Sequence, residues 1–158
     1  MNPVRLLVIF FAAMVAQWWW MTHFSIFGLA PQLLLVLTVA LAARYGALWG
    51  MSAGFLWGLF LDLMSPRLFG ANALAFTWIA WGTGSVRRQI DVAGLGPQAV
   101  VVVAMTWAYF LLLGVLGLIF SKSFFWVGLP AFCLDPFYNA VVTTVLFALW
   151  TPRWEHRR

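Results

Sequence analysis

Six runs of apolar residues fill most of the chain, and turn residues, basic residues or aromatic clusters separate them. A helix of about 20 residues crosses the hydrocarbon core of a bilayer. The pattern therefore predicts an all-α polytopic membrane protein with six transmembrane helices. The expected spans cover residues 4–21, 31–44, 46–64, 71–86, 98–120 and 131–150.

The boundary between the second and third runs allows two interpretations. Only Arg44, Tyr45 and Gly46 separate them, so they form either a tight helical hairpin or one long bent helix that leaves five spans. Basic residues favour the hairpin, because short cytoplasmic loops carry an excess of Lys and Arg. With six spans and a cytoplasmic N-terminus, seven lie inside (Arg5, Arg44, Arg87, Arg88, Arg153, Arg157 and Arg158) and two lie outside (Arg67 and Lys122). We therefore expect both termini in the cytoplasm.

Composition agrees with lipid as the solvent of the whole chain. Hydrophobic residues make up 65% of the 158 residues and charged residues 8%, whereas a soluble domain carries about 25% charged residues. We expect one transmembrane domain over residues 1–158. The net charge of +5 does not indicate nucleic acid, because the basic residues lie singly or in pairs between apolar runs. The first run ends in Trp18, Trp19 and Trp20 rather than in small residues suited to cleavage, so it is interpreted as a retained span and not a signal peptide.

Four glycines recur at intervals of four residues in the third run: Gly46, Gly50, Gly54 and Gly58. Glycine costs about 1 kcal/mol against alanine inside a helix, so a compensating contact is expected. Small residues at this spacing let two helix backbones approach closely in lipid. Two interpretations stay open: packing within this chain, or a site for the helix of another protein.

Acidic and amide residues interrupt two of the runs. Asp62 follows Gly58 by four residues. One interpretation gives it a structural role, as the partner of Arg67 in an ion pair or as a tie between helix and loop. The other gives it a role in binding a ligand or a proton. Asp135, Asn139 and Thr143 share one face of the last run. Asp135 precedes Pro136 and fits the N-cap of a helix that begins there. A buried Asn139 is expected to bond to another helix.

The sequence contains no pattern typical of catalysis or metal binding. His23 and His156 lie far apart and are expected on opposite sides of the membrane, and Cys133 is the only cysteine. There is no Ser/His/Asp set, phosphate loop or pair of carboxylates. We therefore predict no catalytic, cofactor or metal site.

The segment from Leu56 to Arg88 reads LWGLFLDLMSPRLFGANALAFTWIAWGTGSVRR. It resembles the bacterial rod shape-determining protein MreD family, whose hallmark is a glycine-rich helix that ends in Leu-Asp-Leu, followed by a short turn and a helix that closes on basic residues. The matching positions are Gly54, Gly58, Leu61, Asp62, Leu63, Ser65, Gly70, Asn72 and Ala73. Pro31 and Asn139 extend the resemblance, whereas Pro66 and Arg67 are bulkier than the residues usual in the turn.

The resemblance implies a non-catalytic scaffold of the cell-elongation machinery in the bacterial cytoplasmic membrane. Implied partners are an MreC-like bitopic membrane protein within the lipid bilayer and, less directly, a class B penicillin-binding protein and a SEDS glycosyltransferase. The family is also similar in fold to the substrate-binding components of energy-coupling-factor transporters.

That second similarity supplies an alternative function, a small-molecule-binding component of a transporter. Asp62, Asn72, Asp135 and Asn139 are candidates to line an outward pocket, and Ala12 and Ala16 fit a small-residue docking element. A third possibility, an enzyme that acts on lipid, is not favoured, because the sequence contains no recognisable nucleophile and base.

Overall fold

The computed structural model describes residues 3–23, 32–65, 68–87 and 95–150, which form six α-helices and no strand. Their bounds are α1 Pro3–His23, α2 Leu33–Tyr45, α3 Ala47–Met64, α4 Ala71–Val86, α5 Leu95–Ser121 and α6 Leu129–Trp150. The all-α prediction is confirmed. Each expected apolar run corresponds to one helix, and no helix end differs from the prediction by more than three residues.

Within the described residues, three segments are long and apolar enough to cross a membrane: Ala47–Met64, Gly96–Ser121 and Leu129–Leu146. Helix α2 is equally apolar but has only 13 residues, which corresponds to about 20 Å of helix, less than the roughly 30 Å of a bilayer core. Protein rather than lipid surrounds this short helix. It contacts all five other helices, and eight of its residues are buried.

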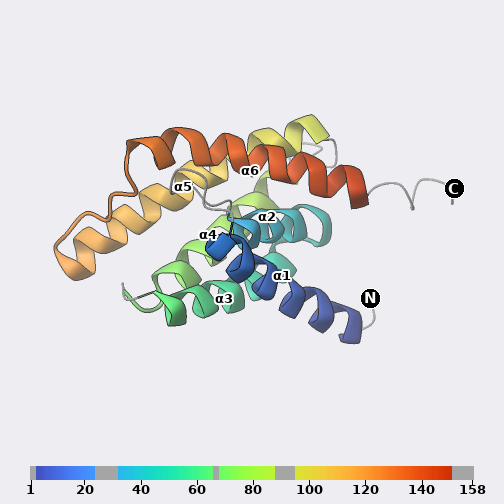
Figure 1. Cartoon of the computed structure of the whole chain (residues 1–158), viewed down its shortest axis with the longest axis horizontal. Helices are drawn as coiled ribbons and strands as arrows, with labels where there is room; N and C mark the ends of the chain where they lie inside the picture. Colours follow the sequence, from blue (N-terminus) through green and yellow to red (C-terminus); the bar gives the residue numbers. More distant parts are fainter. Residues whose placement is uncertain (1–2, 24–31, 66–67, 88–94, 151–158) are drawn as a thin grey trace, which may run out of the picture.

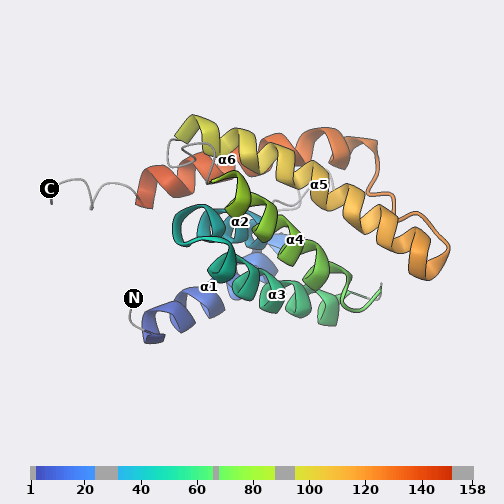
Figure 2. The same ribbon diagram turned by 180° about the vertical axis from the view of Figure 1, so that it is seen from behind.

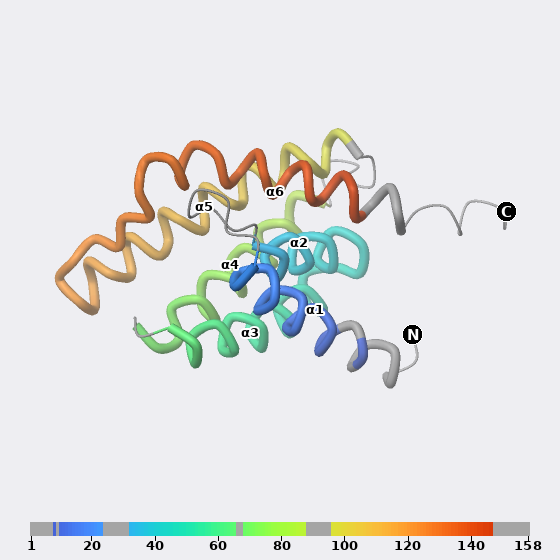
Figure 3. The backbone as a smooth tube through the Cα atoms, viewed as in Figure 1, coloured from blue at the N-terminus to red at the C-terminus, as the bar shows by residue number. Residues whose placement is uncertain are grey.

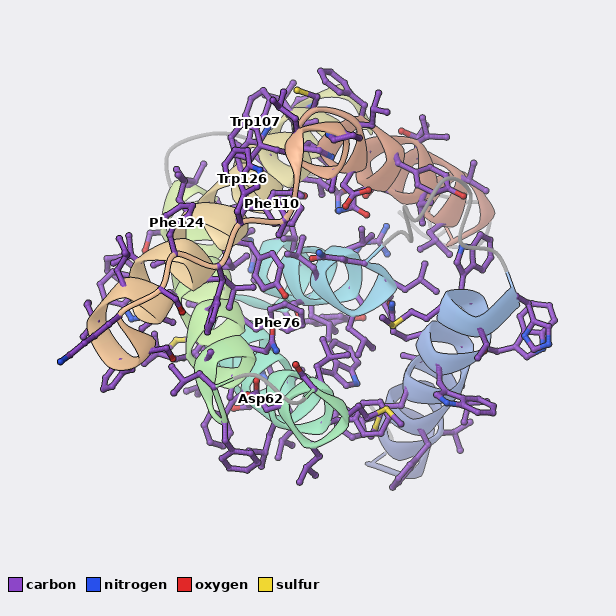
Figure 4. All side chains as sticks on the ribbon, turned by 60° about the vertical axis from the view of Figure 1, so that its left-hand side comes forward. Asp62, Phe76, Trp107, Phe110, Phe124 and Trp126 are labelled. Atoms are coloured by element: carbon purple, nitrogen blue, oxygen red, sulfur yellow. The ribbon has the colours of Figure 1, made fainter. Side chains whose placement is uncertain are left out.

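Successive helices run in opposite directions, as Figures 1 and 2 show from two sides. Helices α5 and α6 form a long antiparallel pair (Figure 3) that packs against α2 and α4, and α1 lies at the edge of the molecule in Figure 4. The core between these layers contains Leu34, Val39, Trp57, Phe76 and Ile79.

Glycines at positive φ make the tight connections. Gly46, with a φ of 98°, ends α2 and begins α3, so the chain forms two helices here rather than one bent helix. Gly70, with a φ of 90°, precedes α4. A side chain is strained in this region of φ, and glycine is not. Arg88, Arg153, Arg157 and Arg158, on which the predicted orientation partly depends, lie outside the described residues, as does His156.

Candidate functional site

Gly50, Gly54 and Gly58 face other helices of the same chain. A Cβ built on Gly58 would lie 2.4 Å from Ala73 Cα in α4, and one on Gly50 would lie 2.5 Å from Ala42 Cβ in α2. At Gly54 it would lie 2.8 Å from Thr38 Cγ2 and 3.1 Å from the Phe76 carbonyl oxygen. The first three of these distances are shorter than real Cβ contacts, and the fourth is tighter than most, so the helices approach as closely at these glycines as the spacing predicted. No open backbone face remains at these three positions for a helix of another protein.

Gly46 and Gly70 have a different role, because they make turns. A Cβ on Gly46 would meet only Arg87 Nη1 at 3.6 Å, and one on Gly70 would meet nothing within 4 Å. Gly84 makes a further close contact, because a Cβ there would lie 2.6 Å from Ala47 Cα. This glycine was not among the positions predicted from the sequence. The pair Gly58 and Gly84 thus brings α3 and α4 into backbone contact near both of their ends.

Asp62 caps the first turn of α4 from the last turn of α3. Its Oδ1 accepts hydrogen bonds from the backbone N–H of Asn72 at 3.0 Å and from Asn72 Nδ2 at 2.8 Å. Its Oδ2 accepts one from the backbone N–H of Ala73 at 3.1 Å. The first N–H groups of a helix lack partners within the helix, and Gly70 at the N-cap has no side chain to supply one. A carboxylate also suits the positive end of the helix dipole.

This arrangement gives Asp62 a structural role, which its hydrogen bonds supply. The side chain is only 3% exposed, and its hydrogen bonds join the last turn of α3 to the first turn of α4, so the tie runs between two helices rather than from helix to loop. Arg67, the ion-pair partner considered from the sequence, lies outside the described residues. Figure 4 shows Asp62 beside α3 and α4, with Phe76 further inside the molecule.

Asn72 extends the Asp62 network to α5. Tyr109 donates its hydroxyl proton to Asn72 Oδ1 at 2.6 Å. Tyr109 is buried, with 6% of its surface exposed, and its ring packs against Phe76 at 5.4 Å between centroids. No spacing pattern singles out Tyr109 in the sequence, because it is a single polar group within a long apolar run.

Asn139 performs a similar task at the start of α2. Its Oδ1 accepts the backbone N–H of Gln32 at 2.9 Å, and its Nδ2 donates to Thr106 Oγ1 of α5 at 3.2 Å. Gln17 of α1 accepts the N–H of Leu34 at 3.3 Å. The first turn of α2 is therefore capped from α6 and α1. Asn139 was expected to bond to another helix, and Gln17 was missed.

Asp135 is not the N-cap of α6, and that interpretation of the sequence is wrong. Helix α6 begins at Leu129, six residues earlier, and Pro136 lies inside it. Proline leaves the carbonyl four residues earlier without its helical donor. Here Trp107 Nε1 donates to that carbonyl, Phe132 O, at 3.0 Å, so the helix continues through Pro136. Asp135 is 6% exposed, and its Oδ1 has no hydrogen-bond partner among the described residues.

A cavity of about 480 Å³ lies where α1 and α3 end and α2 and α4 begin. Its lining residues include the polar side chains of Gln17, Gln32, Ser65, Asn72 and Tyr109. Asn72 and Tyr109 belong to the Asp62 network, and Gln17 and Gln32 belong to the cap of α2. Asp62, Asp135 and Asn139, which were candidates to line an outward pocket, are not among its lining residues.

The described residues contain no group of three or more His, Cys, Asp or Glu side chains that would hold a metal ion. Cys133 is exposed and free. No family model, curated protein or solved structure matches this chain.

Proposed function

We propose that this chain is a non-catalytic scaffold of the bacterial wall-elongation machinery that holds the transmembrane helix of an MreC-like partner. In this proposal the chain crosses the cytoplasmic membrane six times as one domain, with both termini inside, and the short α2 makes its crossing enclosed by the other five helices rather than in contact with lipid. The resemblance over residues 56–88 suggests the partner and its machinery. The Leu-Asp-Leu element of that resemblance contains Asp62, whose hydrogen bonds fix the hairpin of α3 and α4.

The observation that carries the proposal is an exposed small-residue face on α1. Ala12 and Ala16 are exposed and lie one helical turn apart, beside Val8 and Val15, which are 61% and 63% exposed. The opposite face of α1 carries Ala13 and Gln17, which are 7% and 3% exposed. Small residues four apart let a second helix approach closely in lipid. The glycines of α3 are covered by this chain, so this face of α1 is the one that we assign to the partner.

Co-purification tests this assignment. The chain is expressed with an MreC-like bitopic protein, extracted in detergent and captured by a tag, and the recovered partner is quantified. We expect the double variant Ala12→Leu and Ala16→Leu to recover much less partner, because the larger side chains hold the helices apart. Ala104→Leu is the matched control, since Ala104 is an exposed alanine on α5. Equal recovery from both variants would contradict the assignment.

The cavity favours a second candidate function, the small-molecule-binding component of an energy-coupling-factor-type transporter. Its volume of about 480 Å³ lies within the range of roughly 300–1,000 Å³ typical of small-molecule sites. The same purification distinguishes the two functions. A stoichiometric water-soluble, vitamin-like molecule together with an ATPase partner would support the transporter component, and a bitopic partner alone would support the scaffold.

A further inference from the structure

Asp135 lies inside the molecule without a partner for its carboxyl group. Its side chain is 6% exposed, and its Oδ1 has no hydrogen-bond partner among the described residues. Asp62 is similarly buried, but it accepts three hydrogen bonds. An unpaired carboxylate is strongly unfavourable inside a protein, so such a group either binds a proton or leaves the interior. Only the protonated form of Asp135 suits its surroundings.

The neighbours of Asp135 on α6 show which helices enclose it. Asn139 and Thr143 follow it at intervals of four residues on the same helix face, and they are 0% and 1% exposed. Asn139, one turn further along, bonds to Thr106 of α5 and to the backbone N–H of Gln32 directly before α2. The face that carries Asp135 is therefore the one that packs against α5 and α2.

In the part of the chain that the structure describes, no basic side chain faces Asp135. Helix α6 packs against α5 and α2 alone among the described helices. Arg44 is the one cation of these three helices, and it lies at the end of α2 remote from Asn139. Lys122 is exposed, in the loop beyond the end of α5. The other titratable side chains of the three helices are phenols and a thiol, which form no cation: Tyr45, Tyr109, Tyr138 and Cys133.

The remaining basic residues belong to other parts of the chain. Helix α1 carries Arg5 and His23, and Arg67 lies between α3 and α4 in the sequence. Within the described residues, α1, α3 and α4 do not pack against α6. Residues 24–31, which lead into α2, contain no basic residue. The arginines that precede α5 or follow α6 in the sequence belong to the opposite end of this antiparallel pair. A proton is therefore the ligand that neutralises Asp135.

Pro136 separates the first two turns of α6, residues 129–135, from the rest of the helix. Proline has no N–H to give to the Phe132 carbonyl, and the indole N–H of Trp107 takes its place. The Phe132 ring packs against the rings of Trp107, Phe110 and Trp126. One indole hydrogen bond and these ring contacts thus hold the beginning of α6, and both can be released without breaking a backbone hydrogen bond at Pro136.

We propose that Asp135 is a proton-binding site that controls how the beginning of α6 packs against α5. With the proton bound, the neutral carboxyl stays between α6, α5 and α2. When the proton leaves, the carboxylate requires water or lipid head groups, and residues 129–135 turn outward at Pro136. In the topology proposed above this end of α6 lies at the outer side, so the external pH sets its state. The site does not depend on the identity of the partner, so either proposal can fail while the other stands.

Cys133 provides a built-in position for testing this proposal. It is the only cysteine of the chain, it is exposed and free, and it lies two residues before Asp135. A nitroxide on Cys133 is followed by electron paramagnetic resonance in phosphatidylcholine nanodiscs, together with its collisions with a water-soluble nickel chelate. We expect mobility and collisions to rise with pH in a single step about two pH units wide, as for one proton, between about pH 5 and about pH 9.

Two controls locate the proton and the movement. Asp135→Asn keeps the size and polarity of the side chain but cannot become an anion, so its spectrum should match that of the unaltered chain at low pH and should not change with pH. Val141 lies beyond Pro136 and is 59% exposed. A label on Val141→Cys, in a chain that also carries Cys133→Ser, should give a spectrum that is constant with pH.

Reaction with dicyclohexylcarbodiimide tests the bound proton without any substitution. This apolar reagent adds to protonated carboxyl groups in apolar surroundings. Mass spectrometry should find its adduct at Asp135, and the adduct should disappear over the same pH range as the step in the spectrum. A spectrum of labelled Cys133 that is constant with pH, a step that persists in Asp135→Asn, or a step driven by sodium ions at constant pH would each overturn the proposal. An equal change at Val141 would overturn the role of Pro136.

Discussion

The helix pairs α3–α4 and α5–α6 are both antiparallel, but they are held together in different ways. In α3–α4 the backbones touch at Gly58 and Gly84, and the Asp62 carboxylate ties one end. In α5–α6 large rings fill the interface: Trp107 and Phe110 pack on Phe132 with ring centroids 6.5 and 6.2 Å apart. Figure 4 shows Trp107, Phe110 and Trp126 gathered on the side of α5 and α6.

The two pairs should therefore differ in their tolerance of substitution. A backbone contact has no side chain that can move aside, so any added atom displaces a whole helix. An interface of aromatic rings adjusts through its rotamers, and its one interhelical amide contact, Asn139 with Thr106, is neutral. We expect α3–α4 to act as a rigid unit and α5–α6 to accept change.

The largest effect is expected at Asp62. Asp62→Leu removes the acceptor of two backbone N–H groups and of the Asn72 amide. Each buried donor left unpaired costs about 1–3 kcal/mol, so we expect the variant to lose about 4 kcal/mol or to fail to fold. Asp62→Asn keeps one oxygen acceptor and should lose about half as much. Thermal unfolding in detergent, followed by helical circular dichroism, measures both. Equal losses would contradict the hydrogen-bond account and would favour a role that requires the charge of Asp62.

The sequence was sufficient to predict the helices because lipid is the expected solvent. The length of each apolar run can be read without reference to the rest of the fold, and the distribution of basic residues favoured the hairpin between α2 and α3. The glycine spacing likewise indicated that a backbone would approach α3. It did not indicate which helix would do so, because spacing describes one helix face and carries no information about its neighbour.

The candidate site was harder to predict, because its members are single polar residues on different helices. Tyr109 and Gln17 have no neighbours in sequence that would single them out, and only the folded chain brings them to Asn72 and α2. Asp135 was interpreted wrongly because proline is common at the first position of a helix. The Trp107 N–H that lets α6 continue through Pro136 comes from α5. A prediction based on residues next to Pro136 in the sequence therefore cannot take this hydrogen bond into account.

The next effect in size tests the backbone contact of α3–α4 directly. Gly58→Ala would place its Cβ 2.4 Å from Ala73 Cα, so the helices must separate. We expect a loss of about 3 kcal/mol, the upper part of the usual range for overpacking. Gly82→Ala is the matched control, because its Cβ would meet only Met105 Cε at an ordinary 3.6 Å. The control should be neutral or gain up to about 1 kcal/mol from helix propensity. Similar melting temperatures for the two variants would show that the backbones do not touch at Gly58.

The smallest effect is expected in the α5–α6 pair, at Thr106. Thr106→Val keeps the shape of the side chain but removes the oxygen that accepts the proton of Asn139 Nδ2. Interhelical hydrogen bonds in membrane proteins contribute about 0.6 kcal/mol on average, so the melting temperature should fall only slightly. Thr106 also donates to the Val102 carbonyl of its own helix. Thr144→Val controls for that bond, because exposed Thr144 donates only to Ala140 four residues earlier. A loss at Thr106 as large as that of Asp62→Leu would mean that α5–α6 depends on one polar contact as strictly as α3–α4 does, and the contrast between the two pairs would not hold.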